Sequence, residues 1–196
     1  MRYDAEHKEL TRRKVLSKAA AAIRRHGPAG VSVADLMAQA GLTHGGFYAH
    51  FKSKDELVAE AISAMFDERY RGFRSYVEGK EPARGLAMFV DRYLSTTHRD
   101  GIQSGCPLPS LSSDVARLPV AARRRFAAGA ERLTQGIANV LRELGKTDPR
   151  DLAASMLAEM VGALALSRAV ADPDLSGQIL TSSREAIKRR IGLDQN

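Results

Sequence analysis

Two short segments of helical patterning, separated by a tight turn at Gly41, constrain the fold of this chain more than any other sequence feature. We expect Ser32 to cap the first segment, Thr43 to cap the second, which ends near Phe51, and Ser53 to cap the helix that follows. Glycine adopts a positive φ at little cost, so a turn at Gly41 lets the second helix cross the first. Apolar side chains would fill the space beneath that crossing, namely Leu36, Ala40, Leu42, Phe47 and Phe51. The spacing predicts a helix-turn-helix, although an ordinary helical hairpin in a bundle would show the same turn.

The residue types expected to face outward from the second segment indicate that it contacts a ligand. They are Thr43, His44, Gly45, Gly46, Tyr48 and His50. Each of the two adjacent glycines costs about 1 kcal/mol relative to alanine inside a helix, and close approach to a DNA groove would offset that cost. Tyr48 and His50 carry hydrogen-bonding groups on short stems that suit phosphate oxygens. Lys54 follows at the start of the next helix, where backbone N–H groups also favour an anion.

Positive charge is concentrated at the same end of the chain. Residues 1–55 hold ten basic and five acidic side chains, so they carry +5 of the formal net charge of +7. A basic head on a nearly neutral body is typical of proteins that dock a polyanion at one end. A solvated surface would show the same excess, so charge alone leaves both interpretations open.

Helical periodicity also dominates the rest of the chain, which shows no strand-like alternation and no repeats. The pattern predicts an all-α fold of about nine helices. We expect a three-helix DNA-binding domain over residues 1–53 and a helical effector-binding and dimerisation domain over residues 54–196. The expected helices lie near 6–26, 33–40, 44–51, 54–78, 82–98, 106–115, 119–144, 149–171 and 174–191.

The sequence also argues against several classes of protein. No run approaches about 18 apolar residues and the N-terminus lacks the apolar core of a signal peptide, so we expect a cytoplasmic protein. No nucleophile elbow, phosphate loop, dinucleotide fingerprint or zinc-protease motif occurs, so we expect neither an enzyme nor a cofactor. The five histidines and the single cysteine do not form a metal-ligand set.

The chain resembles the TetR family of transcriptional regulators over Gly41–Leu57, which reads GLTHGGFYAHFKSKDEL. Its aromatic-x-His-aromatic centre, followed by Lys-x-Lys-acid-acid-Leu, is specific to that family, and the resemblance covers roughly residues 8–60. It implies base reading in the major groove by one group of residues and phosphate contacts by a second. The first group is Thr43, His44, Gly45 and Gly46, and the second is Ser32, Tyr48, His50 and Lys54.

Two departures from the family pattern bear on how DNA would be read. Met37 stands where the family usually carries a small residue between the crossed helices, so local packing must differ. The glycine pair leaves few side chains for hydrogen bonds to bases, so we expect substantial indirect readout. A basic N-terminal arm would then sit in a minor groove or on phosphates, through Arg2, Lys8, Arg12 and Arg13.

The remainder of the chain matches the family in length and helical layout. The resemblance implies a homodimeric repressor that leaves a palindromic operator on a small-molecule or thiol-reactive signal. Apolar stripes near 149–171 and 174–191 favour dimerisation through the last two helices, since one small head covers too little DNA. Burial within one chain would give similar stripes.

The middle helices would line an effector pocket or simply form core, through Met65, Phe66, Phe73, Met88, Phe89, Tyr93 and Phe126. A helical protein-interaction adaptor is the alternative function, but it would not explain the basic excess or the glycine pair.

Cys106 is a candidate sensor of oxidants or electrophiles. Pro107 suits the first position of a helix, which places the thiol at the N-cap, where the helix dipole favours a thiolate. The alternative is a small buried hydrophobe. Ser104-Gly105-Cys106 also resembles a branch of the family that contains electrophile- and redox-responsive repressors such as NemR.

Overall fold

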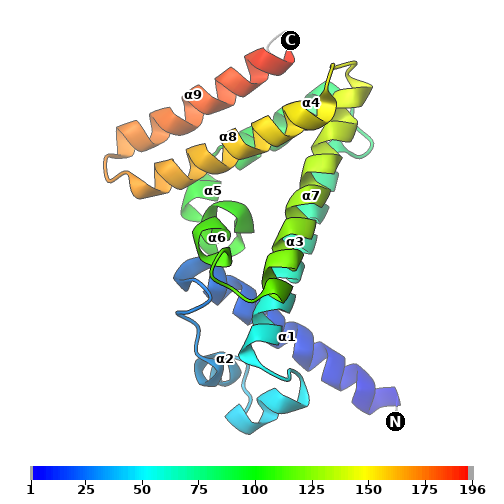
Figure 1. The fold of residues 1–196 in the computed structure, drawn as a ribbon, viewed down its shortest axis with the longest axis vertical. Helices are drawn as coiled ribbons and strands as arrows, with labels where there is room; N and C mark the ends of the chain where they lie inside the picture. The colour runs from blue at the N-terminus through cyan, green and yellow to red at the C-terminus, as the bar shows by residue number, and fades with distance from the viewer. Residues whose placement is uncertain (1, 194–196) are drawn as a thin grey trace. The chain divides into compact units, whose positions relative to one another are not determined.

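The structure is a computed structural model that describes the backbone of residues 2–193 and the side chains of residues 6–193. Over that range it is helical and contains no strand, so the predicted all-α class is confirmed (Figure 1). The elements described are nine α-helices and two short 3-10 helices. They are α1 (Arg2–His26), α2 (Val33–Gln39), η1 (His44–Ala49), α3 (Lys54–Val77), α4 (Pro82–Tyr93), α5 (Thr96–Asp100), η2 (Ile102–Ser104), α6 (Pro107–Val115), α7 (Val120–Glu143), α8 (Pro149–Ala169) and α9 (Pro173–Ile191).

Two elements differ from their predictions. The helix expected over 82–98 is divided into α4 and α5, because the hydroxyl of Ser95 accepts a hydrogen bond from the His98 backbone N–H at 3.2 Å. A serine in that position starts a new helix. The helix expected near 44–51 forms as the tighter 3-10 helix η1.

The chain divides into two compact units. Unit 1 comprises residues 1–67 and 102–129, and unit 2 comprises residues 68–101 and 130–196. The helices α3 and α7 contribute residues to both. These units are defined by compactness. The expected domains, 1–53 and 54–196, are defined by function, and that division stays a prediction.

The core of unit 1 is built around α1. Its apolar face is buried at Val15, Ala19 and Ile23. Arg24 is only 5% exposed, and its guanidinium donates to the backbone carbonyl of Gln103 in η2 at 3.1 Å. Where α3 meets α7 in this unit, a Cβ at Gly129 would lie 2.1 Å from the ring of Phe66. Only glycine allows that close approach.

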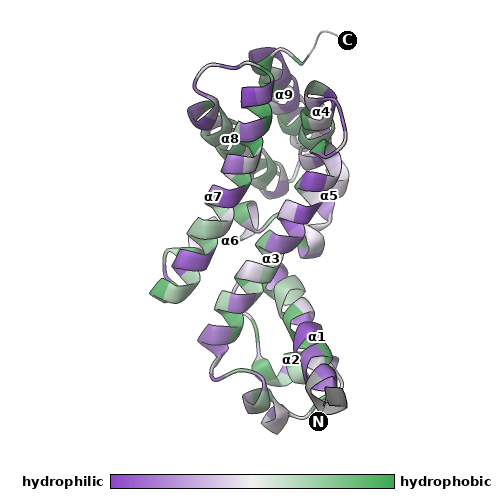
Figure 2. Ribbon diagram, turned by 90° about the vertical axis from the view of Figure 1, so that its right-hand side faces the viewer, coloured by the Kyte–Doolittle hydropathy of each residue, from purple (hydrophilic) through white to green (hydrophobic). Residues whose placement is uncertain are grey.

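Unit 2 combines an apolar core with a network of polar groups. Hydrophilic and hydrophobic residues alternate along α7 (Figure 2), and its buried side chains here include Leu133, Ile137 and Leu141. The helices α8 and α9 lie antiparallel and in contact (Figure 1). The guanidinium of Arg168 in α8 donates to the backbone carbonyls of His98 at 2.8 Å and Arg99 at 3.0 Å.

The helix α8 is the long apolar helix that bears on the expected absence of a membrane span. By length and composition this 21-residue helix could cross a membrane, and it is the one such helix among the described residues. Core helices of soluble proteins pass the same test, and the packing of α8 against α9 is of that kind. Only 39% of its most apolar window is buried within the chain, however. Leu166, at 59%, is the large apolar side chain of α8 that stays exposed among the described residues.

Candidate nucleic-acid interface

The turn between α2 and η1 has the geometry that the sequence predicts. The hydroxyl of Ser32 accepts a hydrogen bond from the Asp35 backbone N–H at 3.3 Å, which confirms the predicted cap of α2. At the other end Gly41 has φ +75°, and the N–H of Leu42 donates to the carbonyl of Met37 at 2.9 Å. This is a Schellman ending, in which the residue after the cap adopts a left-handed conformation. A Cβ at Gly41 would meet nothing within 4 Å, so the backbone angle rather than space requires glycine.

Two stacked phenylalanines hold η1 against the rest of unit 1. Phe47 is 2% exposed and Phe51 is 1% exposed, and their ring centroids lie 5.5 Å apart. Met37 of α2 is fully buried. Thr43 occupies the expected N-cap position in an extended conformation, but its side chain makes no capping hydrogen bond, which corrects that part of the prediction. The position of η1 therefore depends on the packing of Phe47 and Phe51 rather than on a side-chain cap.

The predicted base-reading residues lie together on this one element. Thr43, His44 and Gly45 are exposed, and the neighbouring Tyr48 is 68% exposed. Tyr48 also places the edge of its ring against His44, with ring centroids 6.4 Å apart. An aromatic ring this exposed contributes little to the core, so its surroundings do not explain it.

Neither glycine of the pair is required by packing within the chain. A Cβ at Gly45 would meet nothing within 4 Å, and one at Gly46 would make ordinary contacts of 3.6 Å with Met37 Cε and Thr43 Oγ1. Neither residue has a positive φ. Neither packing within the chain nor the backbone angle φ therefore accounts for the two glycines.

His50 is half-buried beside this surface. Burial lowers its pKa, and the positive charges of Lys8 and Arg12 lower it further. The ring is therefore neutral near pH 7, where it carries one N–H donor. Its Nδ1 is buried and has no hydrogen-bond partner among the residues that the structure describes.

Lys54 is the first residue of α3, the helix that follows η1 in the chain. The hydroxyl of Ser53 accepts a hydrogen bond from the Glu56 backbone N–H at 3.1 Å, so the predicted cap of this helix is confirmed. The ammonium of Lys54 donates to the carbonyl of Ala29 at 3.4 Å. Ala29 belongs to the loop that leads into Ser32, so two predicted phosphate contacts lie on neighbouring stretches of backbone.

Arg12 differs from its expected role in a DNA-binding arm. Its guanidinium pairs through both terminal nitrogens with the carboxylate of Glu60, with Nη2 and Oε1 2.6 Å apart. It also lies 4.5 Å from the centroid of the Phe51 ring. The hydrogen bond with Glu60 raises the pKa of Arg12. Arg12 is thus part of the support for η1, and the 48 residues between the ion-pair partners explain why local sequence patterns miss it.

The other residues of the expected arm lie on a helix rather than on an extended segment, because α1 begins at Arg2. Arg13 pairs with Glu9 at 2.9 Å across one helical turn, and Lys8 is exposed. The side chain of Arg2 lies outside the described residues.

Cys106 occupies the predicted N-cap of α6, with Pro107 in the first turn. Its side chain is fully buried. Burial of this kind is typical of a packing role, and the proposed sensing role stays a prediction.

Comparisons with known proteins agree with this geometry. Residues 15–61 match the model of the bacterial regulatory proteins, tetR family. Residues 82–182 match the model of the tetracyclin repressor-like C-terminal domain. No match was found among curated proteins.

Solved structures are similar over nearly the whole chain. A TetR transcriptional regulator from Chloroflexus aurantiacus J-10-FL is 25% identical with a TM-score of 0.82, covering 95% of this chain and 96% of that one. The reduced form of NemR from E. coli is 18% identical with a TM-score of 0.81, covering 91% and 95%. A TetR-family regulator from Agrobacterium tumefaciens is 23% identical with a TM-score of 0.78, covering 92% and 98%.

Proposed function

Because this chain belongs to the TetR family of bacterial regulatory proteins, we propose that it represses transcription by occupying a palindromic operator as a homodimer. It is a DNA-binding transcriptional regulator, and members of this family are not in general enzymes. The family binds small-molecule effectors as well as DNA and forms dimers. Its regulators are soluble, and we propose that this one acts in the cytoplasm.

The exposed glycine pair at the start of η1 is the observation that best supports the DNA contacts. With no side chain at Gly45 or Gly46, the backbone can approach base edges closely, beside Thr43 and His44. Phosphate contacts flank this surface in our proposal, from Ser32, Tyr48, His50 and Lys54. Such contacts set position and register on the duplex, while the few base contacts leave room for readout of DNA shape.

Dimerisation would use apolar surface that α8 and α9 leave uncovered. Leu166 in α8 is 59% exposed and Leu175 in α9 is 47% exposed. Gly162 has open space where a Cβ would stand, which would let a partner helix approach closely. Several residues of the predicted stripes, including Met156 and Met160, are already buried within one chain. The proposed interface is therefore narrower than the stripes in the sequence.

For the effector, a row of aromatic rings in unit 2 supports binding in the C-terminal domain. Phe73 and Phe89 have ring centroids 4.9 Å apart, and Phe89 and Tyr93 have centroids 5.8 Å apart. Met88 is 38% exposed and does not belong to this core. Phe66 and Phe126 contact each other in unit 1 instead. Binding of an effector that changes the spacing of the two heads would release the operator.

The proposal is tested by selecting duplexes from a random pool with the full-length chain. We expect the selected duplexes to contain a palindrome with half-site centres about 34–36 Å apart. Two chains should bind it, with an affinity that falls steeply as salt rises.

The dimer interface has a test of its own. Leu166→Glu should dissociate the dimer in sedimentation measurements and abolish tight binding. Val120→Glu is the matched control, because Val120 is 58% exposed in unit 1 and lies outside α8 and α9. Salt-independent binding without sequence preference would favour the adaptor function.

The thiol-reactive signal requires a separate test. Treatment of the native protein with an electrophile should modify Cys106 and weaken its affinity for the selected duplex, whereas a Cys106→Ser variant should be unaffected. Modification with unchanged duplex affinity, or no modification of the folded protein, would leave only the small-molecule signal.

A further inference from the structure

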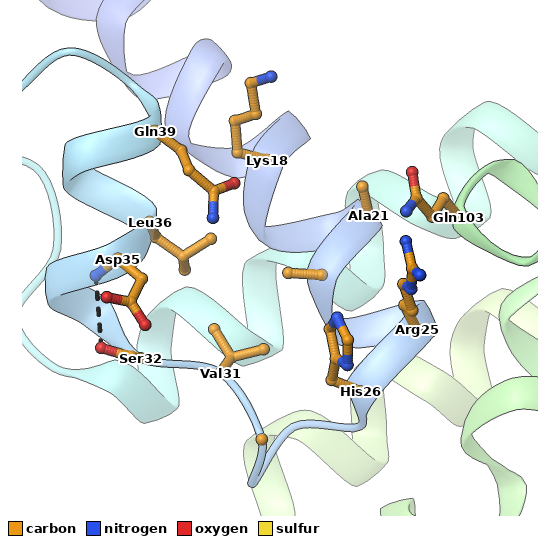
Figure 3. Close-up of a pocket in the computed structure, with 12 residues that line it drawn as sticks. Lys18, Ala21, Arg25, His26, Val31, Ser32, Asp35, Leu36, Gln39 and Gln103 are labelled. Carbon is orange, nitrogen blue, oxygen red and sulfur yellow. Dashed lines mark hydrogen bonds between the residues drawn. The ribbon is translucent and has the colours of Figure 1, made fainter.

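A hollow of about 440 Å³ lies in unit 1 between the second half of α1 and α2 (Figure 3). Ala21 and Ala22 of α1 supply its partly exposed apolar side chains, and the almost fully buried Val31 and Leu36 lie behind them. A volume of this order is in the range of sites for small molecules. The hollow belongs to unit 1, whereas the aromatic row that supports the proposed effector site belongs to unit 2.

The rim of the hollow is mostly basic. Lys18, Arg25 and His26 line it from α1, while Asp35 is the one acidic residue among the lining residues and comes from α2 (Figure 3). Lys18 and Arg25 are exposed and form no ion pair with the side chains that the structure describes. Exposed cations without a counter-charge beside an apolar surface attract an anion that carries an apolar portion.

Neutral hydrogen-bonding groups complete the lining. Gln39 lies on the α2 side and Gln103 on the side of η2. The Ser32 hydroxyl accepts the capping hydrogen bond of α2 and keeps its O–H donor, which the proposed phosphate contact uses. The proposed DNA contacts use none of the basic residues at this rim.

We propose that this hollow binds a small organic carboxylate. The carboxylate lies against Arg25, Lys18 adds positive charge at another part of the rim, and the apolar portion lies on Ala21 and Ala22. Such a ligand would lie between α1 and α2. An amine of the same shape is disfavoured, because it would meet two cationic side chains, Lys18 and Arg25, and only one carboxylate.

Replacing Asp35 should change the affinity for a carboxylate in the direction opposite to replacing Arg25. Its carboxylate repels an anion in the hollow, so Asp35→Asn should tighten binding, while the backbone N–H that donates to Ser32 is retained. Arg25→Gln should weaken binding by about two- to fivefold, as expected for a solvent-exposed charge pair. Arg123→Gln is the matched control, because this exposed arginine lies in unit 1 and does not line the hollow.

The experiment is an NMR titration of the nitrogen-15-labelled full-length chain with butyrate, hexanoate and benzoate. Butylamine, hexylamine and benzylamine serve as charge-reversed partners. We expect at least one carboxylate to shift the amide signals of Ala21, Ala22, Val31 and Leu36 at millimolar concentration, with little response to the amines. The Arg25, Asp35 and Arg123 variants should then differ in the directions given above.

Three results would overturn the proposal. One is the absence of these shifts with all three carboxylates at about 10 mM, where even a weak site would be populated. Another is an equal response to the amines, which would indicate a purely apolar surface. The third is a loss of duplex affinity in Arg25→Gln as large as that in Lys54→Gln, with no change in carboxylate binding, because the rim would then belong to the DNA interface. Loss of the proposed operator binding would by itself leave the titration unaffected.

Discussion

The two units of the molecule use their basic side chains in different ways. In unit 1, Lys18, Arg25 and Lys52 are exposed and their side chains have no ion-pair partner among the described residues. In unit 2, Lys188 pairs with Asp91 at 2.6 Å, and Arg190 pairs with Glu159 at 2.8 Å. Unit 1 also holds paired cations, such as Arg12 with Glu60, so the two units differ in which positions are paired and not in the residue types that they use. Net charge indicates a polyanion partner only where the charges are not already paired.

The largest expected effect comes from removing a basic side chain that forms hydrogen bonds within unit 2. Arg168→Ala would leave the carbonyls of His98 and Arg99 without their guanidinium donor. We expect the free energy of unfolding to fall by about 3 kcal/mol, as for the removal of hydrogen bonds to a charged group. Denaturant unfolding measures this change. Arg25→Ala, at an exposed position of α1 in unit 1, should change stability by no more than about 0.5 kcal/mol. Equal losses in the two variants would remove the distinction.

Acidification should weaken unit 2 through His98. Burial and the nearby charge of Arg69 lower the pKa of His98 to about 4, while its Nδ1 lies 2.8 Å from the carbonyl of Tyr93. The unfolded chain therefore binds this proton near pH 6.5 and the folded chain near pH 4, so stability is lost as pH falls between those values. From pH 7 to pH 5 we expect a loss of about 2 kcal/mol.

The contribution of His98 is isolated by comparing slopes. Denaturant unfolding over pH 7 to pH 5 should show a shallower pH dependence for His98→Asn than for the natural chain, whatever the absolute stability of the variant. An identical slope in both proteins would mean that His98 does not titrate as this environment requires.

Within unit 1, the glycine pair predicts a change in binding without a loss of stability. Gly45→Ala meets no atom within 4 Å and should leave stability unchanged or raise it by up to about 1 kcal/mol. Affinity for the selected duplex should fall by about tenfold, or roughly 1.4 kcal/mol, because the methyl group prevents close approach. Gly72→Ala in α3 also meets nothing within 4 Å and is the control. It should leave duplex affinity intact, and a similar fall in both variants would show that the effect is not local.

The smallest effect concerns a single phosphate group of the duplex. Lys54→Gln should reduce the slope of log affinity against log salt by about 0.9 for each phosphate that the variant no longer neutralises, without changing which sequence is preferred. Arg71→Gln, an exposed change in α3, should leave the slope nearly unaltered. A change in sequence preference in the Lys54 variant would instead assign this residue to base reading.

Local patterns were sufficient to predict most helices of this fold. Serine caps at Ser32 and Ser53, the turn at Gly41 and Pro107 at the start of α6 each act within a few residues, so the sequence displays them directly. Where two signals overlap, as at the Ser95 cap inside an amphipathic pattern, periodicity alone predicted one helix too long.

The candidate interface was predicted less completely, because part of it depends on distant pairing. Tyr48 and Gly45 are exposed as expected from their own segment. Arg12 was assigned to a DNA-binding arm, yet its partner Glu60 lies on another helix and the pair supports Phe51. The hollow beside α2 likewise combines α1, α2 and η2, and no single segment reveals it.

The position of Met37 beneath η1 has a consequence for how this protein could acquire a new operator preference. A side chain added at Gly45 would enter open solvent, so evolution or design can vary that position without repacking. At Gly46 the first added carbon makes ordinary contacts of 3.6 Å with the terminal methyl of Met37 and the hydroxyl of Thr43, so a side chain larger than alanine would require the flexible end of Met37 to move. The two adjacent glycines thus offer different starting points for a change of operator preference, one in open solvent and one in contact with a side chain of α2.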